Sequence, residues 1–370
     1  MRVLAWIELF WPYVGGIEVR TANFLEALRE RGHEVAVITS TGSLSLPEID
    51  SFRGISIRRL PLLDALSRPD LGLFAGTMRA VKDFKQQFQP DVVHIQFTDP
   101  SPLFHWMTHA IRPVPTVVTV PISLPDAPAG DGGLAARTLG SASWVVACSK
   151  AMLNHTRHQV PELEGRSSVI YNSLPAPSIE PAPLPDGPPV VLVIGRVVRD
   201  KGFDLAIDAM PRVIERFRDA RLIIAGDGPE RQALEDQAQR LGIASQVQFA
   251  GWVEPEQIAR LINQCSLVLM PSRWEEAFGL VALQAMQMAR PVVVSKVGGL
   301  PEVITDGLTG LAVPNENPPA LAEAAIALLS DPIRSVEMGL AGRSRALSTF
   351  SFPRFVTEHE NLYTYLLQSK

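Results

Sequence analysis

The stretch VVLVIGRVVRDKG, at residues 190–202, is typical of a buried parallel strand and the loop that leaves it. Residues 190–194 are a run of aliphatic residues that is too short for a buried helix, and a glycine ends it. Comparable runs recur along the chain, and stretches with the apolar spacing of helices separate them. This alternation predicts parallel β-α-β units and an α/β fold of doubly wound sheets.

The strand pattern occurs twice, so we predict two domains. Residues 175–189 contain seven prolines, a composition that suits an extended linker and excludes a helix or a central strand. We therefore expect one domain at residues 1–174, the linker at 175–189, a second domain at 190–350 and a C-terminal amphipathic helix at 351–370. The predicted strands are residues 3–7, 35–39, 92–97, 116–120, 145–148 and 169–171, then 190–194, 222–225, 247–250, 267–270 and 292–295.

The composition of the 370 residues is that of a folded globular protein with a net charge of -5. This charge argues against an overall affinity for nucleic acid, because phosphate binding needs a positive surface. Cys148 and Cys265 are the only cysteines, and both lie in apolar runs, which favours a reducing cytoplasm over a secreted scaffold. The first residues lack the pattern of a signal peptide, and no apolar run is long enough to span a membrane.

Two loops at predicted strand ends have residues suited to binding phosphate. Gly15 and Gly16 lie just before a predicted helix, where backbone N–H groups and the helix dipole favour an anion. Arg196 and Lys201 follow the strand at 190–194, and two cations there suit a diphosphate. The alternatives are a tight turn for the glycines and a solvated basic loop for the cations.

The segment PSRWEEAFGLVALQAM, at residues 271–286, follows a further predicted strand. It places Glu276 before a helix that opens near Phe278 and Gly279, and Gln284 lies on that helix. A carboxylate and free helical N–H groups would then face the same crevice at the carboxyl end of the sheet. The alternative is that Glu276 only complements the dipole of the helix.

These segments, in this order, resemble the retaining glycosyltransferases of family 4, which have the GT-B fold of two Rossmann-like domains facing a cleft. The resemblance extends to RGHEVAVIT at residues 31–39, DVVHIQ at 91–96, LIIAGDGP at 222–229, VQFAGWV at 247–253 and RPVVVSKVGGLPEVITDGLTGLAVP at 290–314. It implies an N-terminal acceptor domain, a C-terminal donor domain and a last helix that crosses back to the first domain.

The resemblance also implies roles for individual residues. Gly15 and Gly16 match the loop that meets the donor phosphates, and Arg196 and Lys201 match the basic pair on the diphosphate. Glu276 matches the carboxylate that binds the transferred sugar. Backbone groups of Phe278, Gly279 and Leu280 match the turn that faces the phosphates in the family. Backbone groups around Val253 match the nucleobase site, and Gln284 stands at the position that binds the ribose.

The chain departs from the family pattern at two positions. Gln284 stands where relatives have a second glutamate, and its amide still accepts a hydrogen bond but has no charge. Pro121 stands where relatives have a histidine in the cleft, and proline has no group that could replace it. His94 lies at the end of the preceding strand region and is a candidate substitute, although a packed strand residue with a satisfied ring is the favoured interpretation.

The motifs that are missing narrow the reaction class. The sequence has no Asp-x-Asp pair and no His, Cys and Asp set with metal spacing, so we expect metal-independent transfer without a cofactor. Neither dinucleotide-binding nor P-loop glycine patterns occur. In the family, retention is explained by attack on the front face of the sugar, with the leaving phosphate taking the acceptor proton.

We therefore predict a metal-independent, retaining glycosyltransferase, of the hexosyltransferase type, that acts in glycan, glycolipid or exopolysaccharide synthesis. Its expected partners are a UDP or GDP sugar as donor and a sugar or lipid-linked acceptor, with no nucleic acid. The alternatives are a non-catalytic GT-B homologue that binds nucleotide or a partner protein, and a sugar-nucleotide epimerase. Arg58, Arg59, Lys82 and Lys85 could form a basic patch for peripheral contact with the inner face of the membrane, and solvated faces are the competing explanation.

Overall fold

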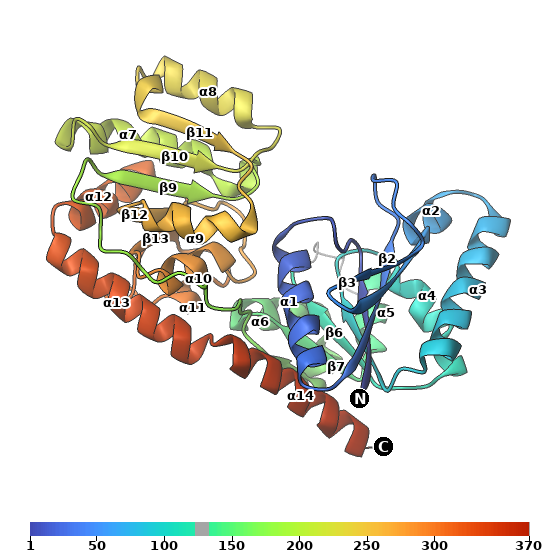
Figure 1. Ribbon diagram of the computed structural model, residues 1–370. Coiled ribbons are helices and arrows are strands. Elements are labelled where there is room, and N and C mark those ends of the chain that lie inside the picture. Colours follow the sequence, from blue (N-terminus) through green and yellow to red (C-terminus); the bar gives the residue numbers. More distant parts are fainter. Residues whose placement is uncertain (123–132, 370) are drawn as a thin grey trace. The chain divides into compact units, whose positions relative to one another are not determined.

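The computed structural model describes residues 1–122 and 133–369, and the chain divides into two compact units. The first unit comprises Met1–Tyr171 and Pro353–Lys370, and the second comprises Asn172–Phe352. Each unit has one sheet with helices packed against it (Figure 1). The predicted α/β architecture with two sheets is therefore confirmed.

An eight-stranded sheet forms the centre of the first unit. Its strands are β1 (Arg2–Ile7), β2 (Glu34–Ser40), β3 (Ile49–Phe52), β4 (Ile55–Leu60), β5 (Val92–Gln96), β6 (Thr116–Val120), β7 (Trp144–Ala147) and β8 (Ser167–Val169). They follow the order β3-β4-β2-β1-β5-β6-β7-β8, and each neighbouring pair is parallel except β3 with β4. The sequence did not predict the edge strand β3 and its neighbour β4, because charged and polar residues interrupt their apolar residues.

Helices and short 3-10 turns alternate with these strands along the chain, and one further helix of the unit comes after the second unit in the sequence. The helices are α1 (Gly16–Glu30), α2 (Leu62–Ser67), α3 (Leu71–Phe88), α4 (Pro102–Met107), α5 (Leu134–Gly140), α6 (Lys150–Gln159) and α14 (Phe352–Gln368), with short 3-10 turns η1 (His109–Ile111) and η2 (Pro161–Arg166). The last of them, α14, is the amphipathic helix predicted at the end of the chain.

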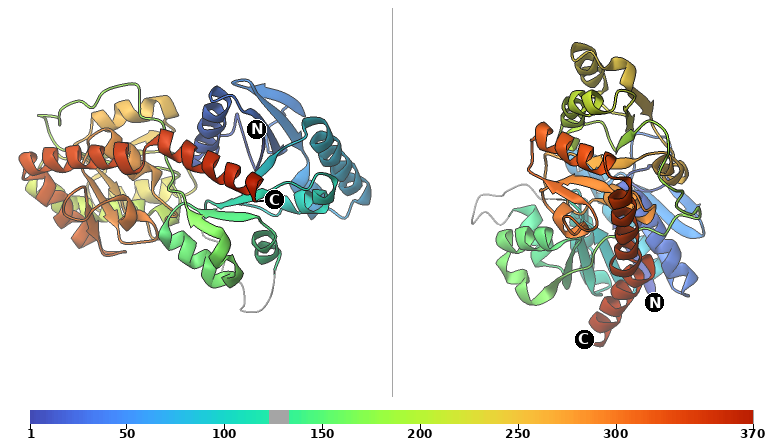
Figure 2. Two further views of the ribbon diagram at one scale, coloured as in Figure 1. Left: turned by 90° about the horizontal axis from the view of Figure 1, so that it is seen from below. Right: turned by 90° about the vertical axis from the view of Figure 1, so that its left-hand side faces the viewer.

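Helix α14, drawn in dark red in Figure 2, belongs to the first unit, and buried polar contacts fasten it to the sheet of that unit. The Tyr363 hydroxyl lies 2.6 Å from Nδ1 of His94, and the rings of His359 and His94 stack 5.3 Å apart. Thr119 Oγ1 lies 2.7 Å from the other ring nitrogen of His94. Burial lowers the pKa of His94 well below its ordinary value, so the ring is neutral. His94 is therefore the packed strand residue that the favoured interpretation predicted.

The second unit has a six-stranded sheet in which all neighbouring strands are parallel. Its strands are β9 (Val190–Ile194), β10 (Arg221–Ala225), β11 (Val247–Gly251), β12 (Leu267–Met270), β13 (Val292–Ser295) and β14 (Leu311–Val313), in the order β11-β10-β9-β12-β13-β14. Its helices are α7 (Phe203–Arg216), α8 (Arg231–Arg240), α9 (Pro255–Asn263), α10 (Leu280–Gln287), α11 (Leu300–Val303), α12 (Pro318–Leu329) and α13 (Pro332–Thr349), with η3 (Arg199–Lys201) and η4 (Ala244–Gln246).

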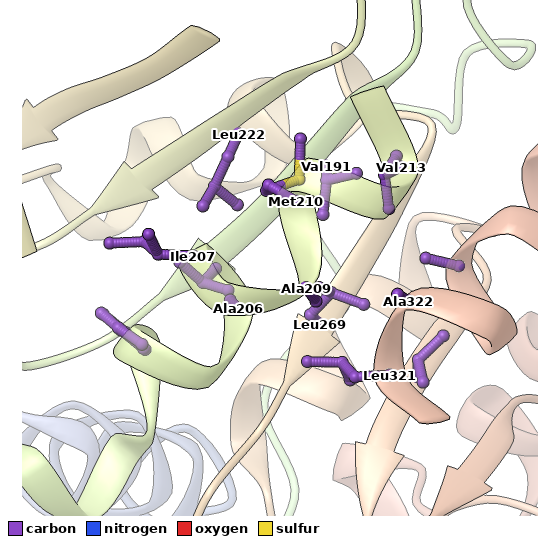
Figure 3. Packing of buried hydrophobic residues seen from close by; sticks show 14 of the residues in the cluster. Val191, Ala206, Ile207, Ala209, Met210, Val213, Leu222, Leu269, Leu321 and Ala322 are labelled. Carbon is purple, nitrogen blue, oxygen red and sulfur yellow. The ribbon is translucent and has the colours of Figure 1, made fainter. Parts of the chain in front are cut away.

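The core of the second unit lies between this sheet and helices α7 and α12 (Figure 3). Helix α7 buries apolar side chains at helical spacing, and they contact side chains from the strands and from α12. The labelled members of this cluster are Val191, Leu222 and Leu269 from the strands, Ala206, Ile207, Ala209, Met210 and Val213 from α7, and Leu321 and Ala322 from α12. This packing fixes the strand ends from which the site is built.

Buried Arg290 bonds part of the proline-rich segment to the second unit. Its guanidinium donates to the carbonyls of Ala182, at 2.8 Å, and Pro183, at 3.1 Å. The same guanidinium donates to the carbonyls of Asn263 and Cys265, at 2.7 and 2.8 Å. Since a carbonyl remains an acceptor in every proline-rich stretch, arginine can anchor a segment that has few N–H donors.

In both sheets the first strand of the unit is central. From β1 the chain adds β2 on one side and later β5 on the other, and from β9 it adds β10 on one side and later β12 on the other. Ligands of open α/β sheets bind at the carboxyl ends of the strands where the order reverses in this way. The expected binding edges are therefore the ends of β1 and β5 and the ends of β9 and β12.

The basic patch considered for membrane contact is not formed as expected. Arg59 and Lys85 are each only 1% exposed, and Arg58 pairs with Glu48 at 2.6 Å. These side chains are bound within the first unit, so the interpretation of the four residues as one exposed surface is wrong. Among the described residues, no helix is both long enough and apolar enough to cross a membrane.

Lys85 gives a testable dependence of stability on pH. Its Nζ lies 2.9 Å from His105 Nδ1 and 2.8 Å from Thr108 Oγ1, and burial lowers its pKa from 10.5 to about 7. Between those two values the unfolded chain holds a proton that the folded protein has released, so the free energy of unfolding rises with pH across this window.

We expect the stability of the wild type relative to Lys85→Met to be flat below about pH 7 and to increase from there toward about pH 10. Urea unfolding of both proteins across this range measures the difference. His105 does not titrate in the window, because burial lowers its pKa well below the ordinary value. A difference that is constant, or that falls with rising pH, would contradict the assignment.

Candidate functional site

The carboxyl ends of β9 and β12 bring two distant loops together. The strands are parallel neighbours, with Leu267 paired to Val191 and Val268 to Leu192. The loop after β9 contains Arg196 and Lys201, and the loop after β12 contains Glu276. Residues separated by 75 positions in the sequence therefore meet at one edge of the sheet.

Lys201 and Glu276 form the central contact of this edge. Lys201 Nζ donates to Glu276 Oε1, and Ser272 Oγ donates to the same oxygen at 3.0 Å. The side chain of Lys201 is 32% exposed and that of Glu276 is 15% exposed. Both side chains are therefore partly accessible to a ligand at this edge.

Arg273 fixes the two loops to each other. Its guanidinium holds both carboxylate oxygens of Asp204, at the start of α7, with Nη2 and Oδ2 2.6 Å apart. Its Nε donates to Glu316 at 3.0 Å, and its backbone N–H donates to the carbonyl of Asp200 at 2.8 Å. The hydrogen bond with Asp204 is the largest cause of the raised pKa of Arg273. The sequence analysis missed this residue, because nothing local in the sequence identifies its partners.

Gly298 and Gly299, just before the body of α11, lie against the backbone of Glu276. The residue has a φ of +51°, and a Cβ there would lie 2.3 Å from the carbonyl oxygen of Glu276. The next residue, Gly299, donates its N–H to that same carbonyl at 2.7 Å. The backbone of Glu276 is thus held against a segment in which a side chain does not fit.

Helix α10 begins at this same edge. Gly279 precedes it with a φ of +109° and makes no side-chain capping bond, so no side chain occupies the first turn as a cap. Phe278 is buried and packs edge-on against Phe350, with ring centroids 5.4 Å apart. Leu280 is the first residue of α10, and Gln284 lies half-buried on the same helix. The helix therefore offers backbone N–H groups at its beginning.

Other predicted site residues also lie close to strand ends. Arg196 is exposed directly after β9, and Val253 is half-buried shortly after β11. Gly15 precedes α1 in the first unit and has extended backbone angles, and Gly16 is the first residue of that helix. Their participation in one site with Lys201 and Glu276 stays a prediction.

The first unit has polar groups at the corresponding edge, and the sequence analysis assigned no role to them. Glu8 follows β1 and Asp99 lies just beyond β5, and burial is the largest cause of a raised pKa at each. The charge of Asp99 adds to the rise at Glu8. Pro121, directly after β6, is buried. Glu8 and Asp99 each follow a predicted strand, which is the signal in the sequence that could have identified them. The pairing of β1 with β5, which brings them to one edge, could not be read from the sequence.

Among residues 1–122 and 133–369, no group of three or more His, Cys, Asp or Glu side chains is arranged to hold a metal ion. The polar groups at the two sheet edges are instead two separate sets. In the second unit a carboxylate lies beside a lysine, and in the first unit two carboxylates lie near each other. The first set suits an anionic ligand that also has hydroxyl groups.

Family models match both halves of the chain. Residues 14–175 match Glycosyltransferase Family 4, and residues 177–345 match Glycosyl transferases group 1. The chain therefore belongs to glycosyltransferase family 4, and the predicted family and GT-B fold are confirmed. The protein is accordingly a glycosyltransferase that uses a nucleotide sugar as donor.

A glycosyltransferase relative is similar over most of the chain, and two solved structures have the same fold. An uncharacterized glycosyltransferase of Methanocaldococcus jannaschii is 29% identical over 357 residues, which cover 87% of this chain and 88% of that protein. Sucrose-phosphate synthase from Thermosynechococcus elongatus matches over 100% of both chains, with a TM-score of 0.85 and 23% identity. HepE of Anabaena, in complex with UDP-glucose, covers 99% of this chain and 100% of its own, with a TM-score of 0.82 and 21% identity.

Gly298 provides a test of how Glu276 is held. Gly298→Ala adds a Cβ against the Glu276 carbonyl and also places a side chain at positive φ, whereas Gly307→Ala adds only the second cost. Gly307 has a φ of +79° and no neighbouring atom within 4 Å of a Cβ. We expect Gly307→Ala to lose about 1–2 kcal/mol in urea unfolding and Gly298→Ala to lose clearly more. Equal losses of unfolding free energy in the two variants would show that the close approach to Glu276 does not contribute to stability.

Proposed function

We propose that the protein is a retaining glycosyltransferase that moves a sugar from a nucleotide diphosphate sugar to an acceptor hydroxyl. The observation that supports this most directly is the contact between Lys201 and Glu276 at the edge where the strand order reverses. A cation for the diphosphate and a carboxylate for the sugar hydroxyls then lie side by side, as the two parts of such a donor require.

Arg196 and Lys201 would bind the diphosphate of the donor. Both belong to the loop after β9, and Arg196 is exposed while Lys201 keeps a third of its side chain exposed. When the bond between the sugar and the diphosphate breaks, the leaving oxygen gains negative charge, and nearby cations stabilise that charge. The N–H groups at the beginning of α10, from Phe278 to Leu280, would complete the phosphate site.

Glu276 would orient the transferred sugar through its hydroxyl groups. Lys201 and Ser272 both donate to one of its oxygens. A diphosphate that takes over Lys201 would leave the carboxylate free to accept from the sugar. The ion pair thus keeps both groups in place before the donor arrives, which lowers the cost of ordering them on binding.

Val253 and Gln284 would contact the nucleoside, at its base and its ribose respectively. The amide of Gln284 accepts from a ribose hydroxyl without the extra strength of a charged acceptor. The glycine loop at Gly15 and Gly16 would reach the donor phosphates from the first unit. We propose a UDP or GDP sugar as donor, and the UDP-glucose bound by HepE of Anabaena supports the first of these.

Retention would follow from attack on the same face of the sugar that the diphosphate leaves. The bond between the anomeric carbon and the phosphate oxygen breaks, the acceptor oxygen bonds to that carbon, and the acceptor proton moves to the leaving phosphate oxygen. No protein base is needed for this step, which fits a chain with Pro121 at the position of the family histidine. We propose that the reaction is metal-independent, with Arg196, Lys201 and the helix N-terminus in place of a metal ion.

The acceptor would be a sugar or a lipid-linked sugar, in the synthesis of a glycan, glycolipid or exopolysaccharide. Peripheral contact with the inner face of the membrane would go with a lipid-linked acceptor. The competing function is a non-catalytic homologue, which could still bind nucleotide through Lys201. Thermal unfolding with UDP, GDP and their sugar conjugates tests the donor site, because a ligand at 100 times its Kd stabilises by about 2.7 kcal/mol. Transfer or hydrolysis of the nucleotide sugar that binds then separates the enzyme from a homologue that binds without turnover.

Glu276→Gln tests the sugar-binding carboxylate. We expect transfer or donor hydrolysis to fall about a hundredfold or more, because the amide weakens the hydrogen bond and the electrostatic contact with the sugar. Binding of UDP or GDP, followed by calorimetry, should remain. Glu275→Gln makes the same change at the exposed neighbouring residue and should have wild-type activity. Undiminished turnover in Glu276→Gln would contradict the role of Glu276 in binding the transferred sugar.

Arg196→Ala tests the diphosphate contact. We expect the affinity for UDP or GDP to fall about tenfold while the affinity for uridine or guanosine stays unchanged, because only the diphosphate meets the guanidinium. Arg199→Ala, in the same loop, is the matched control for the loss of one exposed positive charge. An equal loss for nucleotide and nucleoside, or an equal effect of Arg199→Ala, would contradict the role of Arg196.

A further inference from the structure

Trp11 presents a large ring at the binding edge of the first unit. It lies in the loop that leaves β1, at the strand where the order of the sheet reverses, and it is 43% exposed. One face of its ring stacks on Phe52, with centroids 4.3 Å apart and planes inclined by 20°. The indole therefore lies flat against a second ring and keeps much of its surface open to a ligand.

Buried contacts hold this pair of rings in place. Arg59 is 1% exposed and donates to the Trp11 carbonyl at 2.5 Å and to Asp50 Oδ2 at 2.8 Å. The bond from Arg59 is the largest cause of the lowered pKa of Asp50, which keeps that carboxyl ionised and the bridge intact. Phe10 packs edge-on against Phe52, with centroids 6.3 Å apart. The backbone of Trp11 and the ring of Phe52 are thus held, which lowers the cost of ordering this loop on binding.

The exposed indole suits a small polar ligand that has one apolar face. Arg53 lies over the Phe52 ring that supports it, with its Cζ 4.9 Å from the centroid. Glu8 begins the same loop, and a carboxylate accepts hydrogen bonds from hydroxyls. A pyranose fits an indole of this kind, because its C–H groups pack on the negative face of the ring while its hydroxyls point away from that face.

Trp11 differs from the other exposed tryptophans in this respect. Trp252 and Trp274 are more exposed than Trp11, at 54% and 60%, and in the described part of the chain neither stacks on another ring. They lie in the second unit, on the loops assigned above to the donor. A flat, supported ring at the edge of the first unit is thus a distinct feature, and the donor site does not account for it.

We propose that Trp11, supported by Phe52, is the platform on which a sugar ring of the acceptor stacks. The acceptor is then a glycoside, with a pyranose ring next to or at the position that receives the new sugar. This proposal rests on the proposed glycosyltransferase reaction and adds the class of acceptor and a residue that selects it. Trp11 binds the acceptor here and takes no part in the transfer of the proton.

The test measures sugar binding by the full-length protein without a donor. Saturation-transfer-difference NMR is recorded with the methyl pyranosides of glucose, galactose and mannose, and with glycerol as a polyol that has no ring. We expect at least one pyranoside to bind with its ring C–H protons closest to the protein. Trp11→Ala should weaken this binding about tenfold, and Trp11→Phe should keep most of it, because a smaller aromatic face remains.

Tyr365→Ala is the matched control. Tyr365 is an exposed aromatic residue of the same unit that contacts the ring of Trp144, and it lies on α14. We expect this variant to bind the pyranosides as the wild type does. Failure of the wild type to bind any of the three, binding no better than glycerol, or unchanged binding in Trp11→Ala would overturn the proposal.

The stabilisation by UDP or GDP, measured on the same proteins, separates this proposal from the proposed function. If Trp11→Ala loses sugar binding and keeps the nucleotide shift, the ring belongs to the acceptor. If the wild type shows no nucleotide shift, the proposed function fails whatever the sugars do. Loss of the nucleotide shift in Trp11→Ala, or loss of binding to anionic phospholipid vesicles in place of sugars, would overturn the acceptor assignment.

Discussion

The parallel pairing of β9 with β12 is the constraint on which the candidate donor site depends. The two strands are neighbours only because the chain adds β10 and β11 on one side of β9 and returns to the other side for β12. The loops that leave these strands then meet, and Lys201 reaches Glu276 across 75 residues of sequence. Arg273 and Gly298 strengthen this arrangement, one by joining the loops and the other by letting backbone approach backbone.

The first unit uses the same principle with different residues. Its central strand β1 has β2 on one side and β5 on the other, and the edge between β1 and β5 bears Glu8, Trp11 and Asp99. Helix α14 supports the sheet on which this edge is built, through the bonded pair of His94 and Tyr363. A neutral, fully bonded His94 is a structural residue, so the proposed mechanism does not depend on it as a substitute for the family histidine.

Three buried cationic side chains of this protein have hydrogen-bond partners in the interior. Arg290 and Arg59 donate to backbone carbonyls and, for Arg59, to one carboxylate, while Lys85 contacts a histidine and a threonine. Burying a charge is costly unless such partners are present. In the sequence alone, Arg59 and Lys85 were candidates for an exposed basic patch. The difference is the burial, which depends on the packing of α3 and β4 against the rest of the unit.

The sequence by itself determined the alternation of strands and helices, the two sheets, the C-terminal helix and the positions of Glu276, Lys201 and Arg196, because these follow from local periodicity and from short motifs at strand ends. Only the tertiary structure decided which residues and loops are in contact with one another. The partners of Arg273, the close approach at Gly298, the burial of Lys85 and the stacking of Trp11 on Phe52 all join residues that are well separated along the chain. Local periodicity has no information about such pairs, since strand order and packing are fixed only when the whole sheet forms.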